Sequence, residues 1–435
     1  KPEGGFDVIP MWVADMNFPA APSIIEAVKE RLNHPAFGYF EPSEEYFDSI
    51  IRWLSKRHGM EGLTKECIGY ENGVLGGVVS ALNVMCSRGD GVLLHTPCYI
   101  GFTSVLKNNG YHPVFSPLVR DQDGIWRMDL LDMEEKMKAK HIHTAIFCSP
   151  HNPTGRVWEK KELEEAFALF RKYDVQVISD EIWSDILLSG HMHIPSQMVS
   201  EDAAMRTVSL YAPSKTFNLA GLVGSYHVIF NKTLRERVDK ESSMTHYNSM
   251  NVLSMHALIG AYREEGEEWV DALCEVLTEN IKYAVSFVRT HFRGVSVFEP
   301  EGTYMLFLDC RQWCQEHGKT LAQLERAGWR VGVAWQDGEM FHGPWSIRIN
   351  LALPFSRVKE AMERLEKYAE GCFLNLYDKN RRSIGTLSEE KQTRYDRLVQ
   401  SSAQPVPQEW KLPKAIDFTV SENAQTYQKP VNSLH

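Results

Sequence analysis

The 435-residue sequence has no apolar run near the ~20 residues that a membrane-spanning helix needs, and its start has no signal-peptide pattern. It also lacks any run of lysines and arginines, because its 47 basic and 57 acidic residues are interspersed and give a formal net charge of −10. Nucleic-acid binding is therefore not expected. Eight cysteines occur singly in mostly apolar surroundings, without a C-x-x-C pair. We expect buried thiols, no metal site and a cytoplasmic protein.

The sequence has no internal repeat and no G-x-G-x-x-G fingerprint, and the second absence argues against a nicotinamide-dependent dehydrogenase. Its apolar residues alternate between helical and strand-like spacing, which predicts an α/β protein with a mainly parallel sheet. Ser23 and Ser43 are placed to cap the first two helices. We expect helices over 23–33, 43–57, 160–172 and 355–369, and strands over 91–95, 143–148, 175–179, 207–211 and 226–230.

The order of these patterns divides the chain into segments. A helix-rich stretch leads into a second α/β unit, whose apolar runs cover 295–309, 330–335 and 345–354. After Tyr368 the sequence turns polar and shows no sustained period, which is typical of an extended or partly disordered tail. We expect an N-terminal segment (1–40), a large α/β domain (41–285), a small C-terminal α/β domain (286–369) and a polar tail (370–435).

The most informative segment is YAPSKTFNLAG, in which Lys215 follows an apolar strand-like run and lies in a turn of small residues. A lysine held out of bulk water can lose its proton and form a Schiff base with an aldehyde. Two upstream segments end apolar strands with polar residues: AIFCSPHNPTGRVW contains Asn152, and VQVISDEIWSD contains Asp180. Because ligands bind at the carboxyl ends of parallel strands, we expect the amide, the carboxylate and the amine to converge on one crevice.

The order N-P-T-G, then S-D-E, then S-K resembles that of the fold-type I pyridoxal-phosphate enzymes, the class I and II aminotransferase superfamily. More narrowly, PMWVADMNFP, GYFEPSEEY, CSPHNPTGRVW and APSKTFNLAG are similar to motifs of its cystathionine β-lyase-like branch, the cysteine-S-conjugate β-lyases. The resemblance covers about residues 6–368 in order. It implies pyridoxal 5′-phosphate as cofactor, bound by the large domain (41–285), which has a mainly parallel sheet of the seven-stranded type. It also implies that the N-terminal segment (1–40) joins the smaller C-terminal α/β domain (286–369), and the tail (370–435) is atypical of the family.

The resemblance also implies roles around the cofactor ring. Lys215 would hold the cofactor and act as the base, Asp180 would pair with the pyridine nitrogen, and Asn152 would donate to the ring hydroxyl. Tyr99 would stack on the ring. Alternatively, Asp180 caps a strand–helix turn, Asn152 forms a turn before Pro153, and Tyr99 is a core residue.

The same resemblance implies a phosphate site. Backbone N–H groups of Gly73, Val74 and Leu75 at a helix start would hold the phosphate, with the hydroxyl of Ser214 added. Many aminotransferases have a phosphate-binding arginine eight residues after the lysine, where this sequence has Val223. The lyase branch tolerates that loss, so Val223 favours this branch.

Five further residues complete the expected site. Tyr39 resembles the tyrosine that reaches the phosphate of the neighbouring subunit, which implies a homodimer; a buried aromatic in a turn is the alternative. Trp183 stands where aminotransferases usually have tyrosine and the lyases often histidine. Its indole can donate a hydrogen bond but cannot relay a proton, so it either reaches the ring hydroxyl or packs in the core. Arg348 is the candidate for the substrate carboxylate. Ala14 and Tyr304 are candidates for lining the substrate pocket.

These residues predict a carbon–sulfur β-lyase that cleaves small cysteine-type S-conjugates, such as cystathionine, to a thiol, pyruvate and ammonia by β-elimination. An aminotransferase is the nearest alternative because it shares every cofactor residue. The unusual tail and Trp183 leave open a cofactor-binding protein with a regulatory or interaction role. The start of the chain at Lys1 leaves open a lyase domain of a larger enzyme.

Overall fold

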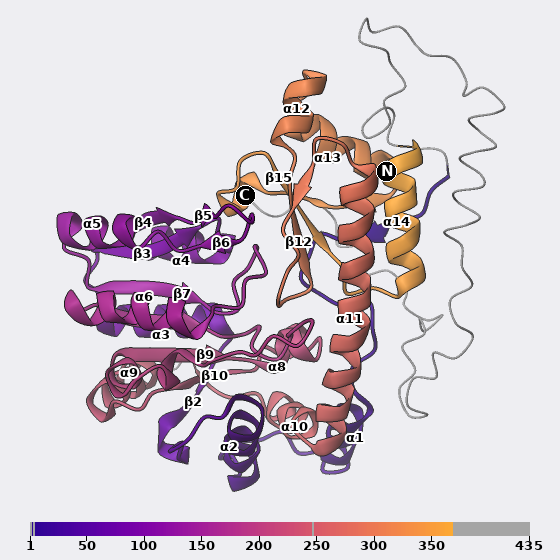
Figure 1. Cartoon of the computed structure of the whole chain (residues 1–435). Coiled ribbons are helices and arrows are strands. Elements are labelled where there is room, and N and C mark those ends of the chain that lie inside the picture. The colour runs from indigo at the N-terminus through magenta and orange to yellow at the C-terminus, as the bar shows by residue number, and fades with distance from the viewer. Residues whose placement is uncertain (1, 3–4, 246–247, 369–435) are drawn as a thin grey trace, which may run out of the picture.

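The computed structural model describes residues 2, 5–245 and 248–368 (Figure 1). Its largest sheet has seven strands, of which β10 runs antiparallel to both neighbours while the other adjacent pairs are parallel. In spatial order these strands are β2 (Ile68–Glu71), β10 (Ser225–Val228), β9 (Thr207–Tyr211), β8 (Gln176–Asp180), β7 (Thr144–Cys148), β3 (Gly91–Thr96) and β4 (His112–Pro117). The predicted α/β fold class is confirmed.

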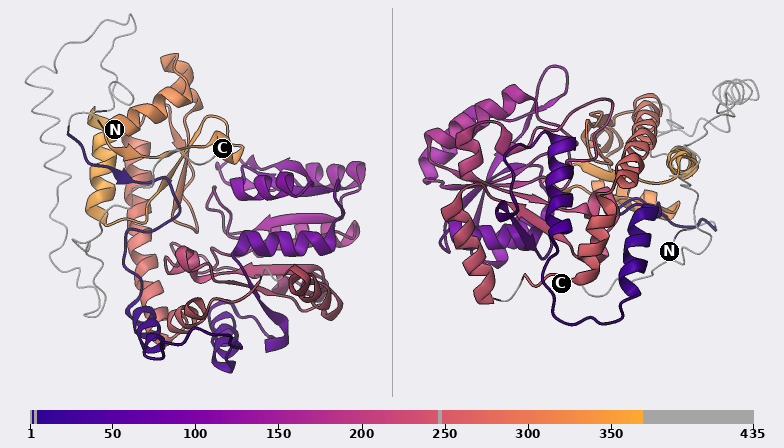
Figure 2. Two further views of the ribbon diagram at one scale, coloured as in Figure 1. Left: turned by 180° about the vertical axis from the view of Figure 1, so that it is seen from behind. Right: turned by 90° about the horizontal axis from the view of Figure 1, so that it is seen from below.

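Alternation of side chains along the central strands gives this sheet two separate core layers. In β7, for example, Ile146 belongs to one layer, whereas Ala145 and Phe147 belong to the other. Because helices cover both faces, the strands read in sequence as continuous apolar runs (Figure 2). One layer is closed by α3 (Val74–Met85), α4 (Ile100–Asn108) and α9 (Lys232–Thr245), and the other by α5 (Leu130–Lys140), α6 (Lys160–Lys172) and α7 (Glu201–Arg206).

A second, four-stranded antiparallel sheet lies in the C-terminal part of the chain. The helix α11 (Glu264–His291) passes beside it and packs against α14 (Phe355–Tyr368) (Figure 1). The N-terminal strand β1 (Ile9–Pro10) pairs with β13 (Val333–Ala334), so the start of the chain lies against this unit. The sheet contains, in order, β11 (Ser296–Val297), β12 (Met305–Asp309), β15 (Ser346–Asn350) and β14 (Gln336–Asp337), and is accompanied by α12 (Arg311–His317) and α13 (Leu321–Arg330).

Local sequence signals account for most helix starts. The predicted N-cap Ser43 is confirmed, because its hydroxyl accepts a hydrogen bond of 3.3 Å from the backbone N–H of Tyr46. The predicted cap Ser23 is wrong: that helix begins at Pro22, with Ala21 as its N-cap. Proline lacks an N–H and has a helical φ, so it suits the first helical position. The helix therefore begins at Pro22, one residue before Ser23. The helix α10 (Val252–Ala261) packs against both α1 (Pro22–Leu32) and α2 (Glu44–His58).

The strand expected over 330–335 is shorter than predicted, because α13 continues to Arg330 and only Val333–Ala334 pair as a strand. The predicted domain boundaries stay a prediction, and the tail 370–435 lies outside the described residues. No helix in the described part of the chain has the length and apolar character needed to cross a membrane. The described chain also contains the hairpin β5 (Val119–Arg120) and β6 (Trp126–Arg127), the short helix α8 (Pro213–Thr216) and four short 3₁₀ helices.

Candidate active site

Register in the large sheet aligns the ends of three neighbouring strands. Cys148, at the end of β7, lies opposite Asp180 at the end of β8, and Asp180 lies opposite Leu210 near the end of β9. The turns that follow these strands carry Asn152 and Lys215. The carboxyl edge of the sheet therefore presents the polar residues that the strand pattern led us to expect there.

Lys215 lies in the short helix α8, directly after β9, and its side chain is largely buried. Its Nζ donates a hydrogen bond of 2.9 Å to the backbone carbonyl of Ala14, which comes from the N-terminal segment. Burial lowers the pKa of the Lys215 amine, and the charge of Arg348 lowers it further, while the carboxylates of Asp15 and Asp180 oppose the shift. The site thus shifts this amine toward its neutral, nucleophilic form.

Asp180 is buried and keeps its proton more firmly than an exposed aspartate does. Burial raises the pKa of Asp180 to about 7, although the backbone N–H of Ile182 donates to its Oδ1 at 3.1 Å. The charge of Glu181 raises this pKa further, and that of Lys215 lowers it. A cationic group bound beside this carboxyl would stabilise its ionised form.

Glu181 points away from Asp180, as expected for adjacent residues at a strand end. Its carboxylate accepts from Tyr211 at 2.7 Å and pairs with His193 at 2.8 Å, and both partners are buried. These hydrogen bonds hold the pKa of Glu181 below its usual value in spite of burial. Glu181 is therefore part of the scaffold beneath the site.

Arg348 extends from the middle of β15 and is buried. Its guanidinium donates to Asn152 Oδ1 at 3.3 Å, to the Trp12 carbonyl at 2.9 Å and to Gln336 Oε1 at 2.7 Å. In the part of the chain that the structure describes, its buried Nε has no hydrogen-bond partner. Burial lowers the pKa of Arg348 to about 10, and the groups that oppose this shift are tyrosines, Tyr99 and Tyr304. A buried cation that pairs with no carboxylate of the described residues is suited to an anionic ligand.

The segment GVL forms the start of α3. Gly73 is the N-cap with φ 82°, a left-handed conformation that favours glycine, and Val74 opens the helix. The first N–H groups of a helix have no carbonyl one turn earlier, so they can bind an anion. We call this helix start, Gly73 to Leu75, the phosphate cup. A Cβ built on Gly73 would lie 3.9 Å from the side chain of Val223, so a valine borders the cup. Leu75 contributes to the first turn, and Ser214 lies half-buried in α8.

Tyr99 is the N-cap of α4 and lies near both the cup and the charged groups. Burial raises the pKa of Tyr99, the carboxylate of Asp180 raises it further, and Arg348 opposes the shift. A Cβ on Gly101 would collide with both the Tyr99 ring and the side chain of Leu75, at 2.4 and 2.8 Å. The ring therefore lies beside the first turn of α3.

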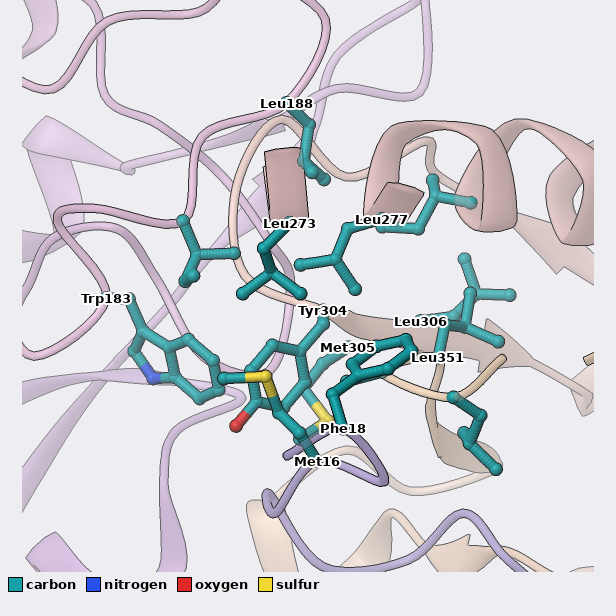
Figure 3. Packing of buried hydrophobic residues seen from close by; sticks show 14 of the residues in the cluster. Met16, Phe18, Trp183, Leu188, Leu273, Leu277, Tyr304, Met305, Leu306 and Leu351 are labelled. Carbon is teal, nitrogen blue, oxygen red and sulfur yellow. The ribbon is translucent and has the colours of Figure 1, made fainter. Parts of the chain in front are cut away.

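Trp183 and Tyr304 form an edge-to-face pair whose ring centroids are 4.6 Å apart (Figure 3). Both are buried in the core cluster that includes Met16 and Phe18. The Tyr304 hydroxyl donates at 2.9 Å to the Ala14 carbonyl, the same oxygen that accepts from Lys215. This contact network favours the packing alternative for Trp183.

Tyr39 is fully exposed in the single chain. The alternative of a buried aromatic in a turn is therefore wrong, whereas a contact with a second subunit stays a prediction.

Sequence reasoning missed the residues that hold the N-terminal segment against the site. Asn218 binds Met16 with both atoms of its amide, accepting from the N–H at 3.1 Å and donating to the carbonyl at 3.0 Å. Asn350 donates to the carbonyls of Val13 and Asp15 at 2.6 and 2.5 Å. A polar residue within the apolar run SIRINLALP was an available signal for Asn350.

The fold and these side chains define a class of protein: an enzyme that can bind an anionic aldehyde cofactor and an amino acid. A model of the aminotransferase class I and II family matches residues 7–365, and the chain therefore belongs to that family. The predicted family, its cystathionine β-lyase-like branch and its pyridoxal-phosphate cofactor are confirmed.

Three relatives illustrate the similarity. The chain is 32% identical to cystathionine β-lyase PatB of Bacillus subtilis over 83% of this chain and 93% of the relative. The pyridoxal-phosphate-bound C–S lyase of Staphylococcus hominis is 32% identical, with a TM-score of 0.79 over 86% of this chain and 96% of that one. A pyridoxal-phosphate-bound proposed aminotransferase of Clostridium difficile 630 is 36% identical, with a TM-score of 0.79 over 84% and 93%.

Proposed function

We propose that this enzyme is a pyridoxal-phosphate-dependent carbon–sulfur β-lyase acting on amino acids that carry a thioether or disulfide at Cβ. The observation that carries the proposal is the largely buried amine of Lys215, which interacts electrostatically with Asp180 and with the guanidinium of Arg348. Among residues 2, 5–245 and 248–368, no carboxylate pairs with that guanidinium. The similarity to enzymes named as cystathionine β-lyase and C–S lyase supports the reaction type.

Arg348 and Asn152 act in binding. The guanidinium binds the substrate carboxylate, for which its Nε is available because no described residue forms a hydrogen bond with it. Asn152 Oδ1 already accepts from Arg348, so its Nδ2 is the group left to donate to the cofactor hydroxyl. One hydrogen bond thus links carboxylate binding to cofactor orientation.

Lys215 and Asp180 act on protons. When bound, pyridoxal phosphate supplies an electron sink for the charge that develops at Cα. Lys215 removes the Cα proton, for which its depressed pKa is appropriate. Asp180 would keep the pyridine nitrogen of the bound cofactor protonated. The positive charge of that ring would in turn offset the cost of burying an ionised carboxylate at Asp180. The Cβ–S bond then breaks, the sulfur leaves with the electron pair, and water completes the release of pyruvate and ammonia.

The alternative, amino transfer, uses the same Lys215 and Asp180. It is supported by the similarity to the proposed aminotransferase of C. difficile. Elimination is favoured by Val223 beside the phosphate cup, where many aminotransferases have arginine. We therefore treat amino transfer as the competing outcome of the test below.

The assembly and compartment belong to the same proposal. The full exposure of Tyr39, next to exposed Phe37, suits a homodimer in which Tyr39 reaches the partner's phosphate site. In the described part of the chain the seven cysteines are free thiols, which suits the reducing cytosol.

The function is tested by adding pyridoxal phosphate to purified protein and recording its visible absorption band, then adding L-cystathionine and assaying pyruvate. We expect the wild type to form the band and to release pyruvate at catalytic rates, and Lys215→Ala to do neither. Failure of the wild type to form the band contradicts the cofactor assignment, and a band without pyruvate contradicts the lyase assignment.

A further inference from the structure

A buried carboxylate precedes the phosphate cup in the chain and packs against α3. Glu71 is the last residue of β2, two positions before the N-cap Gly73, and only 1% of it is exposed. Its Oε1 pairs with His227 Nδ1 at 2.8 Å, and its Oε2 accepts from Ser80 Oγ at 3.1 Å. The cost of burying this charge is offset only while such donors stay in place.

Asn248 supplies a third donor and also reaches the turn itself. Its Nδ2 donates to Glu71 Oε2 at 2.6 Å and to Ser242 Oγ at 3.0 Å. Its Oδ1 accepts from the backbone N–H of Asn72 at 3.0 Å. The side-chain amide of Asn248 therefore links the Glu71 carboxylate to the backbone N–H of Asn72, the first residue of the turn that leads into α3.

The backbone of the turn is fixed at further points. The N–H of Gly73 donates to the carbonyl of Glu71 at 3.0 Å, and the same carbonyl accepts from Ser225 Oγ at 2.8 Å. With Asn248 bound to the N–H of Asn72, the peptides that lead into α3 cannot rotate independently. This fixed backbone holds the N–H groups of the first helical turn in the direction in which they point out of the N-terminus of α3, where an anion can bind.

This preorganisation matters because Val223, a residue without charge, borders the cup. When no guanidinium attracts the phosphate at that position, binding depends on the direction of the backbone N–H groups and on the helix dipole. The carboxylate of Glu71 would repel a phosphate if it turned toward the cup, and Asn248 is one of the donors that hold it back.

We propose that Asn248 is a positioning residue for the cofactor phosphate: it orients the cup and keeps the Glu71 carboxylate directed away from it. This inference rests on the proposed function, because it assumes that the cup holds the phosphate of pyridoxal phosphate. It predicts a loss of affinity that is specific to the phosphate group and leaves recognition of the ring unchanged.

The test compares two ligands that differ only in the phosphate. Cofactor-free wild type and Asn248→Ala are titrated with pyridoxal phosphate and with pyridoxal, and tryptophan fluorescence is followed. Loss of these hydrogen bonds should weaken pyridoxal phosphate binding by roughly 10-fold or more. Pyridoxal binding should stay within about twofold of the wild-type value, since Lys215 and Asp180 are untouched.

Two further variants sharpen the comparison. Asn248→Asp keeps the side-chain size and the acceptor for Asn72 but loses the donor to Glu71, and it should show the same phosphate-specific loss. Asn109→Ala removes an amide that donates to the Val105 carbonyl at 2.8 Å, and it should change neither affinity.

Equal losses for both ligands, or no loss for either, would overturn the positioning role. A wild type that binds pyridoxal phosphate no better than pyridoxal would also overturn it, because the phosphate would then contribute nothing. If the wild type binds neither ligand, the proposed function fails and the inference fails with it.

Discussion

The Nη1 of Arg348 donates a hydrogen bond of 3.3 Å to the Oδ1 of Asn152, residues separated by 196 positions in the chain. The first lies in β15 of the small sheet and the second in the turn that follows β7 of the large sheet. This contact joins the residue proposed to bind the substrate carboxylate to the residue proposed to orient the cofactor. It also fixes which atom of the amide is free to donate.

Replacing Arg348 by lysine should weaken substrate binding. Lysine keeps a positive charge but cannot form two parallel bonds to a carboxylate, and it cannot keep all the contacts to Asn152 and Gln336. We expect kcat/KM to fall roughly 10- to 100-fold, mainly through KM. Steady-state kinetics with L-cystathionine measures the effect.

The matched control is Arg235→Lys, at a guanidinium that donates to the Ile229 carbonyl in the loop before α9. This control should leave KM unchanged. An unchanged KM in the Arg348 variant would show that the carboxylate binds elsewhere.

Asp180 should make the cofactor-free protein less stable as the pH rises. Its folded pKa of about 7 lies above the unfolded value of 3.8, so the folded protein holds the proton more tightly. The stability from this proton is present below about pH 4 and is lost progressively as the pH rises to about 7. The loss can reach about 4 kcal/mol in the free energy of unfolding.

Asp180→Asn cannot ionise, so the Asp180 contribution to the pH dependence should be absent from this variant. Buried His95 and His151, whose pKa values are lowered to about 4 and about 3, stabilise the fold as the pH rises and are present in both proteins. Between pH 5 and pH 8 the stability of the wild type should therefore fall by more, or rise by less, than that of Asp180→Asn. Chemical denaturation of the cofactor-free proteins measures that difference. Asp123→Asn, at an exposed carboxylate, should keep the wild-type difference. The prediction is wrong if the free energy of unfolding changes by the same amount in wild type and in Asp180→Asn between the two pH values.

Parts of this site could be predicted from local sequence, and parts could not. Asp180 and Lys215 follow apolar strand runs, so their place at one edge of the sheet follows from strand direction and alternation. The carbonyl of Ala14, which accepts from Lys215, lies 201 positions away, and periodicity carries no information about such a contact. The same holds for Asn248 and Glu71, which are 177 positions apart.

Asp15 should tune the pH dependence of turnover. Its carboxylate opposes the lowering of the Lys215 pKa, so Asp15→Asn should lower that pKa further. The limb of the pH–rate profile in which Lys215 loses its proton should therefore move to lower pH. High salt should move the wild-type limb in the same direction, since Asp15 is exposed and its charge is screened. A shift toward higher pH would contradict this relation.

Trp183 should behave as a packing residue. Trp183→Ala should lower the free energy of unfolding by about 3–5 kcal/mol, because it leaves a cavity beside Tyr304. Trp183→Phe should be milder and should keep kcat within a few-fold of the wild type. If Trp183 instead donates to the cofactor hydroxyl, Trp183→Phe will fold normally but lose most of its kcat.

The most direct test of the lyase assignment is the product ratio. The wild-type enzyme loaded with pyridoxal phosphate is given L-cystathionine without any keto acid, and free thiol, pyruvate and ammonia are counted, with Lys215→Ala as the control. We expect equal amounts of the three products over many turnovers and none from the variant. Sustained turnover only when a keto acid is added, with no thiol released, would contradict elimination and identify the enzyme as an aminotransferase.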